Sequence, residues 1–219
     1  MKLERSICCR ELKKLDVLDS SEHKIGKIND MTFTFDGDLR LSQFILGGSA
    51  WEEFMESVGV KSDKDPVFDA SLIEKMDEEV YLNTAKNSLK TTLDDCAITD
   101  EEFRLSDLEK KDILDKDGFK LGKAVDVDFE VDGSASVIVG GGFVEELLEK
   151  FGMKRDVDVI VPGDTIESIG DVVKLTVSKK ELELNMDEAV KKPEQKEAKR
   201  HKTVTQDVAK VRLFSQRPF

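Results

Sequence analysis

The sequence predicts an all-β protein built from two tandem small β-barrels, with two short helices and a flexible C-terminal tail. The first observation is an internal repeat: residues 16–37 recur as residues 112–133 at a constant offset of 96, without a gap. Within each copy, apolar residues alternate with polar ones, and turn signals containing Gly separate the alternating runs. The matched pairs are Val17 and Ile113, Leu18 and Leu114, Asp19 and Asp115, Lys24 and Lys120, Ile25 and Leu121, Gly26 and Gly122, Lys27 and Lys123, Asp30 and Asp126, Phe33 and Phe129, Asp36 and Asp132, and Gly37 and Gly133.

The first repeat begins with the strands expected within residues 5–18. Their core candidates are Ile7, Leu12, Leu15 and Val17. These apolar residues are separated by charged ones, which suits short strands of a small barrel.

The next segment predicts a β-hairpin. Residues 31–35 alternate between large apolar side chains and Thr, the pattern of a half-buried strand. Asp36 and Gly37 then predict a type I′ turn, and residues 39–46 form the returning strand.

A helical pattern follows in each repeat. In residues 49–58, apolar side chains recur at positions i, i+3, i+4 and i+7, and Gly59 follows as a helix-ending residue. The second copy lies 93 residues later, which shortens its hairpin by three residues. Each helix is expected to pack its apolar face on a barrel. The apolar residues are Trp51, Phe54, Met55 and Val58 in the first copy and Val144, Leu147, Leu148 and Phe151 in the second.

The rest of each repeat predicts a strand, a single turn and a further strand. In the first copy these are residues 66–68, a turn carrying Ile73 and Met76, and residues 80–84. Their counterparts lie at an offset of 93. Residues 86–102 are short and polar, as expected of a linker. The expected domains are therefore residues 1–98, 99–183 and a charged linker with a tail at 184–219.

The second repeat resembles the opening signature of a PRC-barrel, a small β-barrel first described in a photosynthetic reaction-centre subunit. The resemblance covers residues 1–183, and the first repeat departs from it where Glu22 replaces a turn Gly, Asn29 a core-facing Val and Thr32 an acidic residue. The residues that carry it are Asp115, Gly118, Leu121, Gly122, Lys123, Val125, Asp126, Val127 and Phe129.

Charge and cysteine content narrow the function classes. Residues 191–219 carry nine Lys or Arg and three acids, so the rest of the chain carries a formal charge of −19 within the total of −13. A body of that sign is repelled by nucleic-acid phosphates and anionic lipids.

The chain has three cysteines, which support neither a disulfide framework nor a zinc site. Cys8 and Cys9 are adjacent and are expected on opposite faces of a strand. The start of the chain lacks the apolar run of a secretion signal, and no segment is long enough to span a bilayer.

No catalytic or metal-binding constellation is expected. His23 is predicted in an exposed turn and His201 in the linker, neither with a partner at a spacing that builds a nucleophile or metal site. Three other patterns have a structural interpretation that we favour. The alternating acids are interpreted as a solvated strand face opposite buried Val and Phe, the Asp115 segment as a turn rather than a calcium loop, and the triple glycine as a strand-to-helix turn rather than a phosphate site. The residues concerned are Asp126, Asp128, Glu130 and Asp132; Asp115, Asp117 and Gly118; and Gly140, Gly141 and Gly142.

The C-terminal tail is the candidate binding element. After a polar stretch at residues 185–203, expected to be solvated and partly helical, apolar and basic residues return. The alternatives are a disordered terminus and a segment that adds a strand to a partner's sheet or docks aromatic side chains in a groove. The proposed partner-binding residues are Val211, Leu213, Phe214 and Phe219.

Two tandem barrels with no further domain look most like the archaeal cell division protein B group. The resemblance implies a non-enzymatic scaffold, cytoplasmic at the mid-cell division site, that links the adaptor SepF to a paralogous PRC-barrel protein. It would reach the FtsZ ring and the membrane only indirectly, self-associate, and need no cofactor, metal or nucleic acid. The alternative is a module associated with RNA or ribosome maturation, which predicts a basic barrel face. A ligand-binding barrel would need a cavity that so small a barrel fills with its own side chains.

Overall fold

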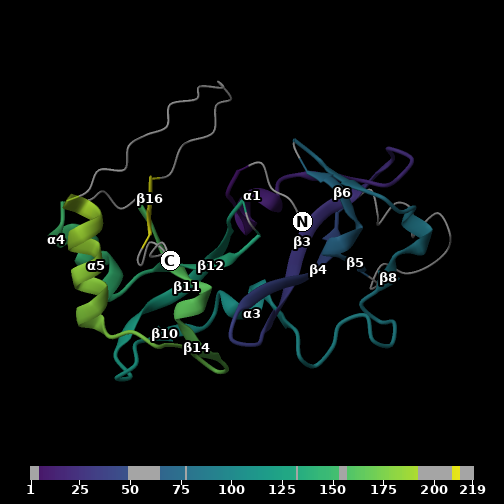
Figure 1. Cartoon of the computed structure of the whole chain (residues 1–219). Coiled ribbons are helices and arrows are strands. Elements are labelled where there is room, and N and C mark those ends of the chain that lie inside the picture. Colours follow the sequence, from purple (N-terminus) through teal and green to yellow (C-terminus); the bar gives the residue numbers. More distant parts are fainter. Residues whose placement is uncertain are drawn as a thin grey trace, which may run out of the picture. The chain divides into compact units, whose positions relative to one another are not determined.

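A computed structural model describes residues 5–48, 65–76, 78–131, 133–152, 157–191 and 209–212 (Figure 1). The described chain is mostly β-sheet with four short helices. It divides into two compact units, residues 1–109 with 126–136, and residues 110–125 with 137–219. The units follow packing rather than the sequence repeat, because residues 99–109 and 126–136 of the second repeat belong to the first unit.

The first sheet has eight strands. Its order is β6-β7-β2-β3-β4-β5-β8, and β9 pairs with β3 off this path. The strand bounds are β2 (Asp16–Leu18), β3 (Lys24–Phe35), β4 (Leu39–Gly47), β5 (Pro66–Asp69), β6 (Ile73–Met76), β7 (Val80–Leu82), β8 (Lys90–Thr91) and β9 (Phe103–Arg104).

The second sheet has the same order of equivalent strands. It reads β14-β15-β10-β11-β12-β13-β16, and β1 pairs with β11 off this path. In the first sheet β2 pairs in parallel with β7, and in the second sheet their counterparts β10 and β15 also pair in parallel. The strands β2 to β7 of the first repeat therefore have the same order as β10 to β15 of the second. The bounds are β1 (Ile7–Cys8), β10 (Asp112–Leu114), β11 (Lys120–Phe129), β12 (Ala135–Gly140), β13 (Val157–Pro162), β14 (Ile166–Ile169), β15 (Val173–Leu175) and β16 (Ala209–Arg212).

Two longer helices belong to the second unit. The helix predicted from apolar spacing is α4 (Phe143–Lys150), which buries Val144, Leu147 and Leu148. The partial helicity expected after residue 185 is the end of α5 (Lys179–Lys191). The counterpart predicted at residues 49–58 lies outside the described residues.

Two single-turn helices, α1 (Cys9–Leu12) and α3 (Leu105–Leu108), were not predicted. Four residues are too few to show a helical period, so residues 5–18 read as strands alone. The core candidates Ile7, Leu12 and Val17 are buried as predicted, and Leu15 is half-buried.

Two local predictions were wrong. The residues predicted as a single turn carrying Ile73 and Met76 form strand β6, and the turn before it is a 3-10 turn, η1 (Ala70–Leu72). The hairpin between β3 and β4 has three loop residues, because Phe35 pairs with Leu39. It is therefore not the two-residue type I′ turn, which requires directly adjacent strand ends.

Each repeat sends its opening strand to the other repeat's long strand, and both pairings lie within the first unit. Ile7 pairs with Phe129 on β11, and Phe103 pairs with Phe33 on β3. Phe103 and Phe129 are the counterparts of Ile7 and Phe33 at the offset of 96. The two pairings are thus equivalent, and the chain exchanges its opening segments reciprocally.

The exchange explains why the expected solvated row of acids was wrong. Asp126 and Asp128 are buried, with 1% and 0% of their surface exposed. On the opposite side, where buried Val and Phe side chains were expected, Val127 and Phe129 are buried as predicted, but Val125 and Val131 are 36% and 51% exposed. Alternation shows which side chains share a face, but here β1 and α1 cover the acidic face. The same reasoning corrects residues 31–35, where Thr32 is fully buried rather than half-exposed.

Aromatic rings fill the core of the first unit. Phe33 stacks on Phe129 with ring centroids 6.1 Å apart, and on Phe103 at 6.2 Å. Phe44 stacks on Phe68 at 5.0 Å. Because Phe33 and Phe129 occupy equivalent positions in the repeat, the stack between them brings the two long strands together.

The turn between β2 and β3 yields a first prediction. Glu22 has a positive φ of 60°, at the position where the second repeat has Gly118 with φ of 85°. This backbone region strains residues with a side chain, so we expect Glu22→Gly to stabilise the fold by about 0.5 kcal/mol. Urea unfolding measures the change. The matched control is Gly118→Ala, which we expect to destabilise by about 1 kcal/mol, since an added Cβ there meets nothing within 4 Å and only the backbone resists. A Glu22→Gly variant that is less stable than the wild type, or a Gly118→Ala variant that is as stable as the wild type, would contradict the proposed backbone strain.

Candidate functional site

Buried polar groups concentrate where the opening segments are exchanged. We call this the exchange junction; it consists of residues 7–12 and 103–108 with residues 30–33 of β3 and 126–129 of β11. Asp126 Oδ2 accepts the backbone N–H of Arg10 at 3.2 Å, and its Oδ1 accepts the N–H of Val127 at 2.8 Å. The Arg10 Nε lies 3.7 Å from the same carboxylate. A buried acid of the second repeat therefore holds the single-turn helix α1 of the first.

Asp30, the equivalent acid of the first repeat, binds the helical turn α3 of the second repeat. Asp30 Oδ2 accepts the Ser106 hydroxyl at 2.7 Å, and Oδ1 accepts the Ser106 N–H at 3.3 Å. Ser106 is the counterpart of Arg10. Each repeat thus contributes one aspartate that holds the helical turn of the other, and these buried carboxylates have a structural use.

The junction also sets the state of the cysteines. Cys8 and Cys9 are buried free thiols, and Cys9 begins α1, so they do not occupy opposite faces of one strand as expected. Burial, reinforced by the charge of Asp126, raises the pKa of Cys8 to about 11 and that of Cys9 well above its ordinary value. Burial also raises the pKa of Asp126, against the hydrogen bonds from Val127 and Arg10. Thiols in this state are protonated at neutral pH and are poor nucleophiles.

A thiol titration tests this description. In the folded chain we expect one cysteine, the exposed Cys96, to react with a thiol reagent at pH 8. Cys8 and Cys9 should react only in denaturant, because their reactive thiolate is suppressed and their sulfur atoms are covered. The measurement is the absorbance of the released chromophore with and without denaturant, and Cys96→Ser is the control that should bring the native count to zero. Three fast thiols in the native protein would contradict the burial.

The end of the linker between the repeats is tied to the first sheet. Glu102 Oε1 accepts a hydrogen bond from the Thr32 hydroxyl at 3.1 Å, and the Gln43 Nε2 group donates to Oε1 at 3.2 Å and to Oε2 at 3.1 Å. Burial acts to raise the pKa of Glu102, but hydrogen bonds from Ser42, Thr99, Gln43 and Thr32 outweigh it and lower the pKa. Residues 99–102 are therefore part of the packed first unit rather than a free connection.

The turns that follow β2 and β10 are held by aspartates. In the second repeat, Asp115 Oδ1 accepts the N–H groups of Asp117 and Phe119 at 2.9 and 2.7 Å, and Oδ2 accepts that of Lys179 at 2.9 Å. The expected turn is confirmed, and its carboxylate oxygens are occupied by backbone donors. Asp19 repeats the arrangement with Ser21, His23 and Lys86.

Lys179 links this turn to two helices of the second unit. Its Nζ lies 4.3 Å from the ring centroid of Phe119 and 4.0 Å from that of Phe143, the first residue of α4. The two rings meet edge to face at 5.8 Å. A cation between two aromatic faces fixes the start of α5 beside α4, with Asp115 holding its backbone.

The Asp115 turn gives a prediction with a defined pH dependence. Burial by itself raises the pKa of Asp115, but the backbone donors of Lys179, Phe119 and Asp117 outweigh it, so the pKa is lowered. The ionised group therefore stabilises the fold above the ordinary Asp pKa of about 3.9, and this stabilisation is lost as the pH falls through the lower folded value. We expect Asp115→Ala to cost about 2 kcal/mol at pH 7. Urea unfolding of this variant at pH 7 measures the cost. The pH dependence is measured with Asp115→Asn: the difference between its free energy of unfolding and that of the wild type should be smaller at pH 3.5 than at pH 7. A larger difference at pH 3.5 would contradict the lowered pKa.

The other sequence candidates have structural positions. His23 is exposed in its turn, as predicted, with Nδ1 3.7 Å from Asp19. His201 lies outside the described residues. The triple glycine forms the predicted turn into α4, with Gly142 directly before the helix and Glu145 and Glu146 in its first turn. Acidic side chains at a helix N-terminus disfavour a bound phosphate.

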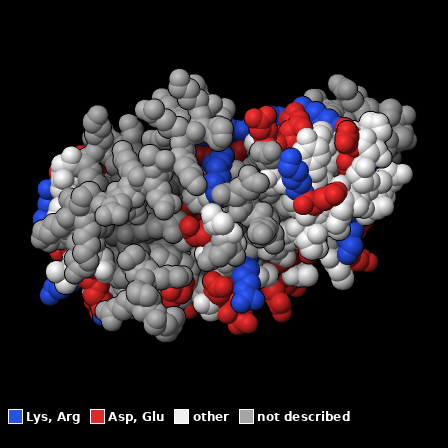
Figure 2. Space-filling view, turned by 45° about the horizontal axis from the view of Figure 1, so that its top comes forward, with Lys and Arg blue, Asp and Glu red and all other residues white. Residues whose placement is uncertain are grey.

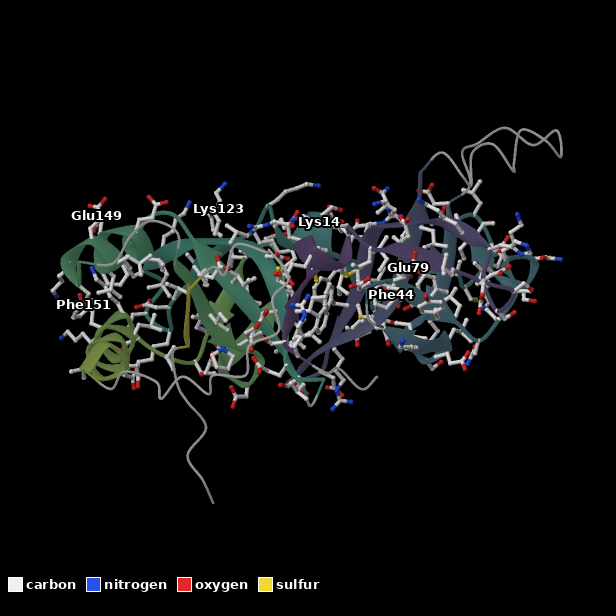
Figure 3. The ribbon with its side chains drawn as sticks, turned by 90° about the horizontal axis from the view of Figure 1, so that it is seen from above. Lys14, Phe44, Glu79, Lys123, Glu149 and Phe151 are labelled. Carbon is white, nitrogen blue, oxygen red and sulfur yellow. The ribbon has the colours of Figure 1, made fainter. Side chains whose placement is uncertain are left out.

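An open polar hollow of about 470 Å³ lies on the first unit. Lys14 and Glu79, both labelled in Figure 3, are on its wall. Two contacts join side chains of this wall: Asp16 lies 3.3 Å from Lys27, and the Tyr81 hydroxyl donates to Glu79 at 2.9 Å. Among the residues that the structure describes, no Ser, Cys or His side chain lines the hollow. The described lining residues are Lys14, Asp16, Lys27, Lys75, Glu78, Glu79 and Tyr81.

The predicted binding tail is described only over β16. Val211 lies in this strand and pairs with Val159 of β13, in parallel. Leu213, Phe214 and Phe219 lie outside the described residues. The sequence predicted that the tail could add a strand to a partner's sheet. In the structure, residues Ala209–Arg212 of the tail add a strand to the second sheet of the same chain. Val211 and its neighbours carry the alternation of a strand, but nothing in the sequence indicates which edge they join.

Within the described residues, no group of three or more His, Cys, Asp or Glu is placed to hold a metal ion. None of the helices in the same part of the chain is long and apolar enough to cross a membrane.

Comparison with known families identifies the second repeat. Residues 100–182 match the family model of the PRC-barrel domain. A PRC-barrel domain is present in the second half of the chain. The match begins just before β9 and α3, so the PRC-barrel domain as defined by sequence includes the segment that pairs with β3 of the first repeat. No curated protein matches the chain.

Proposed function

We propose that the chain is a tandem PRC-barrel scaffold that binds other proteins and catalyses no reaction. The observation that carries the proposal is that its buried and half-buried carboxylates bind groups of its own chain. Asp30 and Asp126 hold the exchanged helical turns, Asp19 and Asp115 hold backbone turns, and Glu102 ties the linker to the first sheet. Buried carboxylates that join chain segments build a rigid framework, whereas a catalytic acid must face a substrate.

The tandem arrangement is part of the proposal. The first repeat has the strand order and pairings of the matched PRC-barrel domain, although the family match covers the second repeat alone. Its departures at Glu22, Asn29 and Thr32 weaken the sequence signal. Asn29 and its counterpart Val125 are both exposed, so that exchange changes the surface rather than the core.

Among scaffolds with this architecture, we favour the FtsZ-based archaeal division machinery. In this proposal the chain links the adaptor SepF to a paralogous PRC-barrel protein, at the mid-cell division site, and contacts the FtsZ ring and membrane only through these partners. The support is the resemblance of two barrels plus a tail to the archaeal cell division protein B group. The tail supplies a basic, aromatic segment on an acidic body, which suits peptide-type docking.

Alanine variants of the tail test the partner-binding residues. We expect the triple change Leu213→Ala, Phe214→Ala and Phe219→Ala to weaken capture of the purified SepF-like adaptor by at least about tenfold, because a few aromatic anchors carry most of the energy of such contacts. Interferometry with immobilised adaptor measures it. The matched control is Leu93→Ala, an apolar residue that is 63% exposed on the first unit. Unchanged affinity in the triple variant would remove the tail from the proposal.

Self-association is tested separately, by sedimentation of the chain alone and mixed with its paralogue. Strictly monomeric behaviour in both samples would contradict the scaffold assembly, because a linker of division proteins must make at least two contacts.

The second candidate is a module of RNA or ribosome maturation. The distribution of charge disfavours it: Figure 2 shows Asp and Glu side chains interspersed with Lys and Arg on the face in view, and residues 1–190 carry a formal −19. Filter binding with ribosomal RNA at low salt discriminates the two functions. The scaffold predicts weak binding that the basic tail accounts for, whereas tight, salt-sensitive binding that survives neutralisation of the tail lysines and arginines would favour the RNA function.

A further inference from the structure

The edge of β13 carries a site that the proposed function leaves unused. On one side β13 pairs with β12, and on the other it pairs with β16, the short yellow strand in Figure 1. The pairing with β16 is parallel and runs over four residues, from Val157 with Ala209 to Ile160 with Arg212. Strand β16 is not the neighbour of β13 in sequence. It comes from the tail, seventeen residues (192–208) after the end of α5.

The first repeat receives a strand at the same edge positions. There Pro66 pairs with Thr91 and Val67 with Lys90, in the antiparallel β5·β8 pair. At the offset of 93, Pro66 and Val67 correspond to Val159 and Ile160, which pair with Val211 and Arg212. The two added strands have different sequences and run in opposite directions. The recurrence shows that this edge accepts an extended segment through its backbone rather than through one fixed set of side chains.

The edge needs a cover on physical grounds. Val159, Ile160 and Val161 of β13 are at most 2% exposed, so the strand is apolar on both faces. An apolar strand with unpaired N–H and C=O groups along one side is a template for another chain. In the first repeat the cover, β8, follows β7 closely in sequence, whereas in the second the chain continues into α5 and the cover is delivered through a long connection.

We propose that the edge of β13 is a binding site for an extended peptide, and that the chain's own residues Ala209–Arg212 are its resident ligand. A second copy's tail is the competing ligand, since it has the same sequence. Because Val211 is also a residue assigned to partner binding, residues 209–212 serve either β13 or a partner at one time. The connection of seventeen residues gives the resident strand an effective concentration on the order of millimolar, so it excludes a free tail present at micromolar concentration.

The register indicates the chemistry of the preferred ligand. Asp158 pairs with Lys210, residues of opposite charge, and Val159 pairs with Val211. Opposite charges at paired positions stabilise a sheet, and like charges destabilise it. The site therefore fits a strand of alternating apolar and basic residues, and it disfavours an acidic one.

Three forms of the full-length chain, all carrying Cys96→Ser, test the site with a fluorescein-labelled peptide of residues 205–216. In the open form, Ala209→Pro with Val211→Pro removes the backbone donors of the resident strand. In the locked form, Asp158→Cys with Lys210→Cys joins the paired positions by a disulfide, which forms only if their Cα atoms lie within about 7 Å. The third form is otherwise wild type. Fluorescence anisotropy measures peptide binding, and no partner protein is needed.

We expect the peptide to bind the open form, to bind the otherwise wild-type form at least about tenfold more weakly, and not to bind the locked form until a reductant is added. A peptide with Lys210→Glu should bind the open form more weakly than the native peptide. Equal binding to all three forms, no binding to the open form, or failure of the disulfide to form under mild oxidation would each overturn the proposal. Burial of Cys8 and Cys9 against thiol reagents confirms that each variant is folded. Because this assay contains no adaptor, its failure leaves the division function standing, and loss of adaptor binding leaves this site standing.

Discussion

The reciprocal pairing of β1 with β11 and β9 with β3 is the constraint on which the first unit depends. It covers the acidic face of β11, buries Asp126 and Asp128, and places Cys8 and Cys9 beside a buried carboxylate. The buried carboxylates of Asp30 and Asp126 then accept backbone N–H groups, from Ser106 and Arg10. Without the exchange these aspartates would be solvated surface residues, and the aromatic stack of Phe33 on Phe129 would lose the segments that enclose it.

The boundaries of the sequence repeats therefore differ from those of the compact units. The match to the PRC-barrel domain spans residues 100–182, whereas residues 99–109 and 126–136 pack with the first repeat. Cutting the chain between the repeats would separate β9 from its partner β3 and β1 from its partner β11. The duplicated architecture behaves in this respect like a dimer whose two subunits have been fused and have kept their exchanged strands.

Much of the fold follows from local pattern. The offset of 96 located β2, β3, β10 and β11, and the spacing of Val144, Leu147 and Leu148 located α4, because period and turn chemistry are properties of neighbouring residues. The burial of Asp126 was not predictable in this way. It depends on a strand more than one hundred residues away in sequence, and an alternating strand gives no sign of what will cover its polar face. The single-turn helices and the strand at β6 were missed because four residues are too few to distinguish periods.

The binding segment at residues 209–212 was likewise predictable only in part. The apolar and basic alternation around Val211 indicated an extended binding segment, and the chain does place these residues in a strand. Its resident position on β13 was not predictable, because an edge becomes available only when the order of the strands is known. The recurrence of β8 at the equivalent edge of β5 was hidden for the same reason, since Lys90 and Thr91 share no pattern with residues 209–212.

The exchange also has a consequence for synthesis on the ribosome. Ile7 and Cys8 emerge among the first residues, but their strand partners Phe129 and Asp128 are made roughly 120 residues later, which is a large separation for a chain of this size. At ordinary elongation rates this interval lasts on the order of ten seconds. During that time the first repeat is incomplete: β3 lacks its partner β9 until Phe103 is made, and β1 lacks its partner on β11 until Phe129 is made. The nascent chain thus passes through a period in which chaperone protection matters more for its first half than for its second.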